Sequence, residues 1–244
     1  MMLLALGIAV AAVAVSVYAL VGAMRAGTPG GGSGPQRLPV GQGPHFLAAA
    51  DFDADGHLDL ATANCREASV SILLGDGGGG FDTATRFPSH GGPTHLIVGH
   101  LDGDDHLDLV TTCHAEDEVD LLWGRGDGFF DPTSLSSGPD SEPHAALIDD
   151  FDHDGLADLA VANGQSSEIV LFYGDGQRGF PRQQHLAVGK GAFSMLAEDL
   201  DGNGWLDLIT ANASSSDVSV VLADDQGGYR DAVRYPVGEH PTIV

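Results

Sequence analysis

One acidic nonapeptide recurs four times along the chain and constrains the fold more than any other feature. It first occurs as DFDADGHLD at residues 51–59, and it returns as HLDGDDHLD, DFDHDGLAD and DLDGNGWLD at residues 100–108, 150–158 and 199–207. Successive copies are 49, 50 and 49 residues apart. A constant period of this size is typical of a repeat architecture in which each repeat forms one structural unit. The position of a residue in the repeat therefore predicts its environment.

The nonapeptide has the composition of a cation-binding loop. Carboxylates stand at positions 1, 3, 5 and 9, and glycine at position 6 permits a tight turn, as in residues 51–59. Ca²⁺ is a hard cation that prefers several oxygen ligands, so the sequence predicts calcium loops. They are not EF-hands, because position 12 is Thr62, Thr111, Val161 or Thr210 instead of glutamate. The alternative interpretation is that the aspartates make Asx turns without metal.

Short apolar runs surround each acidic loop in the same order. In the first unit they cover residues 46–50, 58–63, 70–74 and 85–88, separated by the acidic loop, a polar six-residue loop and a glycine-rich turn. Their length and their β-branched content indicate strands, and none of them has a helical period. Four short strands per repeat predict an all-β fold, a β-propeller with one four-stranded antiparallel blade per repeat. The aromatic residue that closes each glycine-rich turn is expected to fill the gap between adjacent units; these are Phe81, Phe130, Phe180 and Tyr229.

The segments DFDADGHLDLATAN and VSILLGDGGGGF, with a VGxGP lead-in, resemble the FG-GAP/VCBS repeat family, whose blades build the integrin-alpha type of calcium-binding β-propeller. The resemblance covers residues 37–244. It implies that the acidic loop joins the first two strands of a blade and binds Ca²⁺. The side-chain ligands it implies are Asp51, Asp53, Asp55 and Asp59; Asp102, Asp104 and Asp108; Asp150, Asp152, Asp154 and Asp158; and Asp199, Asp201, Asn203 and Asp207. The main-chain carbonyl ligands at position 7 would come from His57, His106, Leu156 and Trp205.

Two of the four loops depart from this pattern. The second loop has His100 at position 1 and Asp105 at the glycine position, so it loses an oxygen ligand and must bend a non-glycine residue through the turn. In the fourth loop, Asn203 keeps an oxygen but removes a charge. Because ligand charge tunes calcium affinity, we expect up to four Ca²⁺ ions, bound most tightly by the first and third loops and most weakly by the second.

The balance of charge excludes some partners. The chain has 35 acidic and 10 basic residues, a formal net charge of −25. Sequence-independent binding to nucleic acid needs Lys and Arg to neutralise phosphates, so we expect no nucleic-acid partner and no binding to anionic membrane surfaces. With 43% hydrophobic residues the chain can bury a core.

The beginning of the chain differs from the rest. Residues 1–24 carry no charged side chain and are long enough to span a bilayer as a hydrophobic helix, but they lack the basic start of a typical signal peptide. We interpret residues 1–26 as a signal anchor or a cleaved signal peptide, and residues 27–36 as a flexible linker rich in Gly, Pro and Ser. Both interpretations predict an extracytoplasmic protein that is either membrane-anchored through this segment or secreted.

The repeats are expected to fill residues 37–244. Their approximate bounds are 44–92, 93–142, 143–191 and 192–240, with a partial fifth repeat at 241–244. Residues 37–40 match the last strand of a unit before the first, so partial repeats are expected at both ends. Because an unpaired sheet edge is an aggregation liability, we expect a portion of a larger propeller or one that closes with help from elsewhere.

Cysteines and histidines leave two questions open. Cys65 and Cys113 stand at nearly equivalent places in neighbouring repeats, a separation that can exceed disulfide geometry. Four histidines recur in the loops that enter successive blades, and they are interpreted either as exposed loop residues or as a transition-metal or pH-sensitive cluster. They are His45, His95, His144 and His240.

The sequence contains no GxSxG, HExxH or phosphate-loop motif. We therefore expect a non-enzymatic, calcium-stabilised adhesion or ligand-binding module whose ligand is a protein or a glycan. The alternative is a carbohydrate-binding lectin or a polysaccharide-active enzyme on the same scaffold. The polar six-residue loops are the expected partner site, since function resides in loops placed by a rigid scaffold.

Overall fold

A computed structural model describes residues 37–243 of the chain. The hydrophobic helix, the anchor or signal peptide and the linker expected in residues 1–36 lie outside the described residues. Within residues 37–243 the structure has no helix that could cross a membrane.

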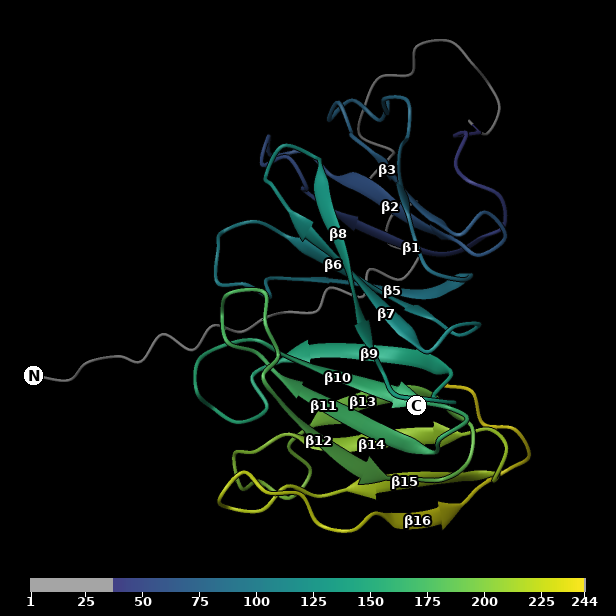
Figure 1. Ribbon diagram of the computed structural model, residues 1–244, viewed down its shortest axis with the longest axis vertical. Coiled ribbons are helices and arrows are strands. Elements are labelled where there is room, and N and C mark those ends of the chain that lie inside the picture. The colour runs from purple at the N-terminus through teal and green to yellow at the C-terminus, as the bar shows by residue number, and fades with distance from the viewer. Residues whose placement is uncertain (1–36, 244) are drawn as a thin grey trace, which may run out of the picture.

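Within residues 37–243, sixteen strands form four antiparallel sheets, one for each repeat, which follow one another in chain order (Figure 1). Blade 1 consists of β1 (Pro44–Ala50), β2 (Asp59–Asn64), β3 (Ser69–Leu73) and β4 (Thr85–Pro88). Blade 2 consists of β5 (Pro93–Gly99), β6 (Asp108–Cys113), β7 (Glu118–Gly124) and β8 (Phe130–Ser136). Blade 3 consists of β9 (Pro143–Asp149), β10 (Asp158–Asn163), β11 (Glu168–Tyr173) and β12 (Arg182–Ala187). Blade 4 consists of β13 (Ala192–Glu198), β14 (Asp207–Asn212), β15 (Asp217–Val221) and β16 (Val233–Pro236).

Each blade is a meander in which sequential strands are neighbours, because short loops join them. The prediction of an all-β, propeller-like fold with four strands per repeat is confirmed. In every blade the acidic loop connects the first and second strands, and position 9 of the loop opens the second strand. The register pairs this residue with the residue just before the loop, as in Ala50 with Asp59 and Asp149 with Asp158.

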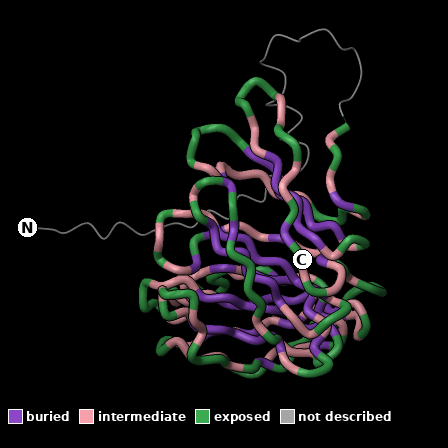
Figure 2. Tube along the Cα trace, turned by 45° about the horizontal axis from the view of Figure 1, so that its top comes forward, coloured by how far each residue is buried: buried purple, intermediate pink, exposed green. Residues whose placement is uncertain are grey.

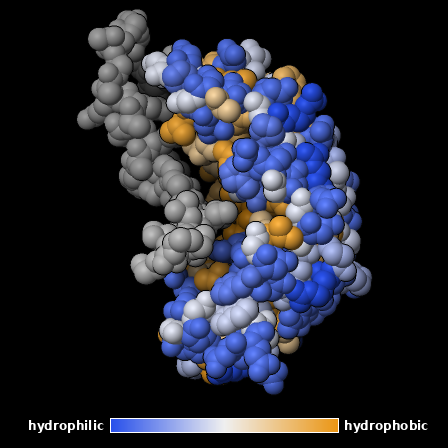
Figure 3. All heavy atoms as spheres, turned by 90° about the vertical axis from the view of Figure 1, so that its left-hand side faces the viewer, coloured by the Kyte–Doolittle hydropathy of each residue, from blue (hydrophilic) through white to orange (hydrophobic). Residues whose placement is uncertain are grey.

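The core lies between the blades. We call the side of a blade that turns toward the next blade its forward face, and the opposite side its backward face. Three hydrophobic clusters join blade 1 to blade 2, blade 2 to blade 3 and blade 3 to blade 4, and within residues 37–243 no cluster joins blade 4 to blade 1. Figure 2 shows the buried segments running through the strands while the loops are exposed. Hydrophilic side chains cover most of the face seen in Figure 3, with hydrophobic residues in the recesses.

Aromatic residues of the glycine-rich turns belong to these clusters, as predicted. Phe130 of blade 2 is buried edge-on against Phe52 and Phe87 of blade 1, at centroid distances of 5.7 and 5.5 Å. Phe180 and Tyr229 pack against the next two clusters along the chain. In blades 2, 3 and 4 the aromatic residue of the turn therefore packs its own blade onto the preceding one, whereas Phe81 of blade 1 belongs to none of the three clusters.

The two ends of the described chain do not form the strands expected of partial repeats. Residues 37–43 and 237–243 contain no strand. They instead follow the path that links one blade to the next: Gly43 and His240 both have positive φ, at 67° and 51°, as do Gly92, Glu142 and Gly191 at the same repeat position.

Candidate metal sites

The aspartate at position 9 holds each acidic loop onto its blade. In blade 1, Asp59 is fully buried, and it accepts hydrogen bonds from the backbone N–H of Phe52 in the loop (2.7 Å) and of Gly75 after β3 (2.7 Å). Asp108, Asp158 and Asp207 accept the equivalent pairs of backbone N–H groups in the other blades. One carboxylate thus joins the ends of three strands. This role belongs to position 9 in all four blades, whether or not the rest of the loop can bind a cation.

In three loops the carboxylates at positions 1, 3 and 9 converge. One oxygen from each of the three residues lies within 4.8 Å of the others. The groups are Asp51, Asp53 and Asp59; Asp150, Asp152 and Asp158; and Asp199, Asp201 and Asp207. Three carboxylate oxygens at this separation fit a hard divalent cation such as Ca²⁺.

The local backbone brings these carboxylates together. Asp51 accepts hydrogen bonds from the N–H groups of Asp55 (3.1 Å) and Gly56 (2.8 Å), so the chain folds back over its side chain. Gly56 has φ of 88°, which favours glycine at position 6. The same bonds to position 1 recur at Asp150 and Asp199.

The side chain at position 5 does not converge with the carboxylates at positions 1, 3 and 9. Asp55 and Asp154 are exposed and accept hydrogen bonds from the N–H groups of His57 and Leu156, both 2.8 Å, and they lie outside the groups of three carboxylates. Asn203 accepts the N–H of Trp205 (2.7 Å) in the same way. Position 5 therefore shapes the turn that presents position 7.

The second loop is built differently. Residues 100–108, all of which the structure describes, contain no group of three converging carboxylates. Instead, Arg178 from the turn after β11 in blade 3 reaches into the loop of blade 2. Its Nε lies 2.6 Å from Oδ2 of Asp102, and its Nη2 lies 3.8 Å from Oδ2 of Asp104. A guanidinium group thus takes the cationic position between two carboxylates.

Two further features of the second loop oppose metal binding. The Nδ1 atom of His100 lies 2.8 Å from the main-chain oxygen of His106, which is the carbonyl at position 7. Asp105 at position 6 does not take the positive φ of Gly56, Gly155 and Gly204; in this loop only Gly103 at position 4 does so (75°). The loop lacks a position-1 carboxylate to draw the chain back, so the turn takes another course. The residues present do not fit Ca²⁺.

Another arginine contacts the third loop. The Nη2 atom of Arg182 in β12 contacts Oδ2 of Asp152, and its guanidinium lies over the ring of Tyr173. The first and fourth loops have no such arginine contact within the described residues. Sequence reasoning missed Arg178 and Arg182, although basic residues are scarce in this chain; Arg178 lies in the glycine-rich turn of blade 3 and Arg182 follows it.

Burial and charge set the proton affinity of the loop carboxylates. Burial raises the pKa of Asp108 and of Asp158 to about 6 each, and it also raises the pKa of Asp59. Desolvation acts in the same direction on Asp102, but its hydrogen bond to Arg178 holds the pKa of that carboxyl below its usual value. Burial of Asp59, Asp108 and Asp158 thus favours neutralisation of these carboxylates, by a proton or by a cation.

The structure answers the two questions that the sequence left open, whether the cysteines pair and whether the histidines form a metal site. Cys65 and Cys113 are both free thiols. The histidines do not form a metal site within the described residues, because the converging groups there are all acidic. His144 instead stacks on Phe193 at 4.7 Å, and this pair lines an open pocket of about 520 Å³ between blades 3 and 4.

Four sheets packed in series, each with an acidic loop between its first two strands, define a propeller-like repeat protein. A sequence profile of FG-GAP-like repeats matches residues 51–111, 100–161 and 150–210. The chain belongs to the FG-GAP-like repeat family.

Several solved structures share the fold at low sequence identity. A protein from Lactobacillus plantarum has a TM-score of 0.60 and 15% identity, over 83% of this chain and 57% of that one. A periplasmic gluconolactonase from Pseudomonas aeruginosa has a TM-score of 0.60 and 18% identity, over 81% of this chain and 55% of that one. A lectin from Agrocybe aegerita that recognises non-reducing terminal N-acetylglucosamine has a TM-score of 0.52 and 19% identity, over 78% of this chain and 52% of that one. The chain thus spans little more than half of each structure. A search of curated proteins finds no match.

Proposed function

We propose that the protein is an exported, calcium-stabilised β-propeller module that binds a ligand without catalysing a reaction. The observation that carries this proposal is the convergence of three carboxylates in the same loop of three blades. Bound Ca²⁺ would neutralise these carboxylates and tie the loop to its blade. The charge-free residues 1–24 support export, either as an anchor or as a signal peptide.

We further propose that three Ca²⁺ ions bind, in the first, third and fourth loops. The first loop has the full carboxylate set and no competing arginine, so its affinity is expected to be highest. Arg182 must release its contact with Asp152 before the third loop binds Ca²⁺, and this lowers the calcium affinity of that loop. In the second loop, Arg178 and His100 occupy the groups that a cation would need.

Isothermal titration calorimetry on the full chain, after removal of metal, tests the number of sites. Three equivalents of Ca²⁺ are expected, and EDTA should lower the melting temperature because the metal binds the folded state. Four equivalents would contradict the role given to Arg178, and none would contradict calcium binding altogether. The triple variant His100→Asp, Asp105→Gly, Arg178→Ala restores the pattern of the first loop and should gain one site. The single variant His100→Asp is its control and should not.

A specific observation favours carbohydrate as the ligand class. In the pocket between blades 3 and 4, the aromatic pair His144 and Phe193 is surrounded by hydrogen-bonding side chains, among them Glu142, Gln165 and Lys190. An aromatic face beside polar groups suits a sugar ring, which has apolar C–H faces and polar hydroxyl edges. Similarity in fold to a lectin is in keeping with this second candidate function.

A glycan array probed with the full chain, followed by calorimetry on the glycans that bind, tests the carbohydrate hypothesis. Phe193→Ala is expected to weaken binding at least tenfold. The matched control is Phe129→Ala, since Phe129 is also an exposed aromatic residue but lies on the glycine-rich turn of blade 2. Equal losses in both variants, or no binding to any glycan, would speak against this pocket as a sugar site.

A further inference from the structure

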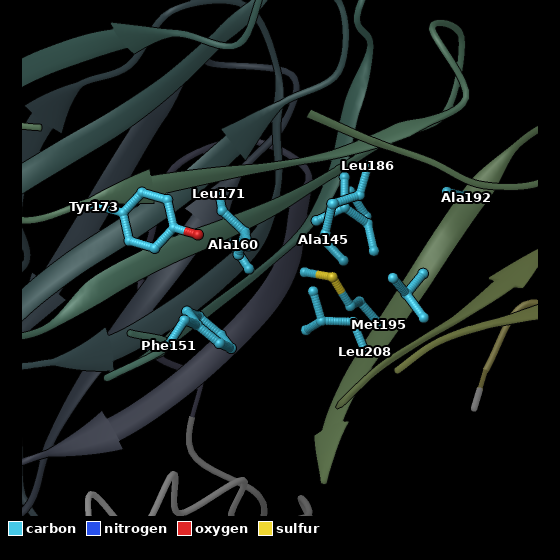
Figure 4. Packing of buried hydrophobic residues seen from close by; sticks show 12 residues of the cluster. Ala145, Phe151, Ala160, Leu171, Tyr173, Leu186, Ala192, Met195 and Leu208 are labelled. Atoms are coloured by element: carbon cyan, nitrogen blue, oxygen red, sulfur yellow. The ribbon is translucent and has the colours of Figure 1, made fainter. Parts of the chain in front are cut away.

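A buried carboxylate lies in an otherwise apolar interface between two blades. Figure 4 shows the apolar character at blades 3 and 4, where Phe151 and Leu171 gather with Leu208. The interface between blades 1 and 2 is similar, but it also contains Asp120 of β7, which is 2% exposed. Side chains of a strand alternate between its faces, so Asp120 lies on the same side as Leu122, toward blade 1. A buried charge is costly unless it is paired, so the partners of Asp120 determine how this junction behaves.

Four groups hydrogen-bond to the carboxylate of Asp120. Its Oδ2 atom accepts the hydroxyl of Ser89 (2.5 Å), the backbone N–H of His90 (2.8 Å) and the thiol of Cys113 (3.2 Å). Its Oδ1 atom lies 2.6 Å from Nδ1 of His90. Ser89 and His90 belong to residues 89–92, the crossover segment that leads from blade 1 to blade 2. The carboxylate therefore fastens the crossover segment to the two middle strands of blade 2.

Three repeat positions differ together at this junction. In blades 1 and 4 the position of Asp120 is serine, that of Cys113 is asparagine and that of His90 is glycine. The equivalent sets are Ser71, Asn64 and Gly41 in blade 1, and Ser219, Asn212 and Gly189 in blade 4. There, the glycine N–H and the asparagine side-chain amide both donate to the serine hydroxyl oxygen. Blade 2 thus keeps the backbone contact but replaces a neutral network by one that contains a carboxylate and an imidazole.

The nature of the cationic partner separates Asp120 from another buried carboxylate, that of Asp217. The Nε atom of Arg234 donates to Oδ2 of Asp217 at 2.9 Å. A guanidinium group keeps its charge at every accessible pH, whereas an imidazole changes its charge near neutral pH. Asp120 has no Arg or Lys partner among the described residues, and the side chain of His90 is 59% exposed to the solvent with which it exchanges protons. The charge beside Asp120 therefore depends on pH.

The groups that face His90 favour its protonated form. The hydrogen bond to Asp120 raises the pKa of His90, partial burial opposes this, and the carboxylates of Glu118 and Glu116 raise the pKa further. The other titratable group on Asp120 is the thiol of Cys113, whose pKa is raised by burial, so it stays neutral. The closed junction thus binds the proton of His90 more tightly than an open one. Closure is fully favoured below the ordinary value of about 6.5 and is weakened as the pH rises through the raised pKa.

The crossover segment also supports the polar loop of blade 2, residues 113–118. A side chain at Gly91 would meet Cγ of Glu116 at 2.6 Å, so the segment and the loop are in close contact. The Nδ1 atom of His114 lies 3.3 Å from the carbonyl oxygen of Gly92. Glu116 and His114 line an open cavity of about 340 Å³. Release of the crossover segment therefore removes a support of the loop that lines this cavity.

We propose that His90, Asp120 and Cys113 form a pH-responsive latch between blades 1 and 2. While His90 is protonated, the latch holds the crossover segment and, through it, the polar loop of blade 2. When His90 loses its proton, Asp120 remains as a buried anion without a cationic partner, and the segment opens more often to admit water. Opening exposes the thiol of Cys113, which is fully buried in the closed latch. The proposal is independent of calcium binding and of the ligand.

The reactivity of Cys113 measures how often the latch opens. The full chain with Cys65→Ser, in which Cys113 is the only remaining cysteine, is labelled with iodoacetamide in EDTA at pH 6.0 and at pH 8.5. The rate for the urea-unfolded chain at the same pH is divided by the rate for the folded chain, which removes the effect of pH on the thiol itself. This protection factor should fall several-fold from pH 6.0 to pH 8.5.

Two variants separate the latch from general charge effects. His90→Gln changes an exposed side chain, and its protection factor should be low at pH 6.0 and vary little with pH. Glu118→Gln is the matched control, because it removes a negative charge two residues from Asp120 without touching the hydrogen bonds of the latch. It should keep most of the pH dependence. Circular dichroism checks that both variants are folded.

Several outcomes would overturn the proposal. Equal protection at the two pH values without further substitution would show that the latch does not respond to pH. An equal fall in His90→Gln would show that another group titrates, and high protection at both pH values in that variant would show that no cation is needed. Loss of the pH dependence in Glu118→Gln as well would assign the effect to general charge.

Discussion

At the scale of single residues, the aspartates of one loop do different work. Asp51, Asp53 and Asp59 converge on the candidate cation position, and both oxygens of Asp59 also accept the backbone N–H groups that hold the loop onto its blade. Four copies of the repeat separate these roles, because the second loop loses the position-1 carboxylate but keeps the position-9 interaction intact. Asp108 has the same two amide donors there, Leu101 and Gly124, although the loop does not fit a metal.

Replacing Asp108 with Asn should therefore destabilise the protein whether or not calcium is present. The amide retains only one oxygen and brings an NH₂ group toward a backbone donor, so a buried N–H loses its acceptor at a cost of about 1–3 kcal/mol. Urea unfolding at pH 7.5, with Ca²⁺ and with EDTA, measures the change. Asp53→Asn is the comparison and should destabilise only when Ca²⁺ is present. A cost of Asp108→Asn that vanishes in EDTA would contradict the structural role.

Residue-level prediction from the sequence worked where the information is local. The spacing of Asp51, Asp53 and Asp59 within nine residues was enough to predict a cation loop, and the structure brings their oxygens together. The contact between Arg178 and Asp102 spans 76 residues and joins two blades, so it depends on blade packing that no local pattern contains. The course of the turn at Asp105 has a local cause instead, because the loop lacks a carboxylate at position 1.

At the scale of elements, the first strands of blades 1 to 3 carry three of the four histidines that the sequence placed in entering loops. His95 lies within β5, with its ring edge-on to Phe46 of blade 1 at a centroid distance of 4.8 Å. Its Nδ1 atom is buried and has no hydrogen-bond partner. Burial lowers the pKa of His95 to about 4. The repeat pattern predicted the strand, but the side chain's burial depends on the neighbouring blade.

His95 should make the protein sensitive to acid. The unfolded chain binds a proton near pH 6.5 and the folded chain only near pH 4, so stability is fully present above about pH 6.5 and is lost as the pH falls toward 4. The shift corresponds to a loss of about 3 kcal/mol. His95→Phe should remove this loss, and His45→Phe, at an exposed histidine of blade 1, should not. Urea midpoints in EDTA between pH 8 and pH 4.5 measure it; parallel curves for wild type and His95→Phe would contradict the assignment.

At the scale of the whole molecule, charge opposes compaction. A net charge of −25 is spread over a small body, and four acidic loops gather part of it into clusters. Self-repulsion of this kind destabilises the folded state, and salt screens it over a Debye length of roughly 10 Å at 0.1 M.

The metal-free protein should therefore become more stable as KCl rises from 10 to 300 mM. Each 1 kcal/mol of repulsion relieved raises the melting temperature by about 2–4 °C for a chain of this size. The calcium-loaded protein should respond less, because the ions have already neutralised part of the charge. Differential scanning fluorimetry in KCl and in NaCl measures both slopes. A melting temperature that falls with salt, or equal slopes with and without Ca²⁺, would contradict this view of the charge.

The hydrogen bonds of the position-9 aspartates have a consequence for the order of assembly. Asp59 and its three counterparts connect loop, second strand and glycine-rich turn through protein atoms alone. A nascent blade can thus acquire its topology before any ion arrives. If Ca²⁺ binds as proposed, folding and metal loading would be separate events in time, and the protein would fold in one ionic environment and gain further stability in another.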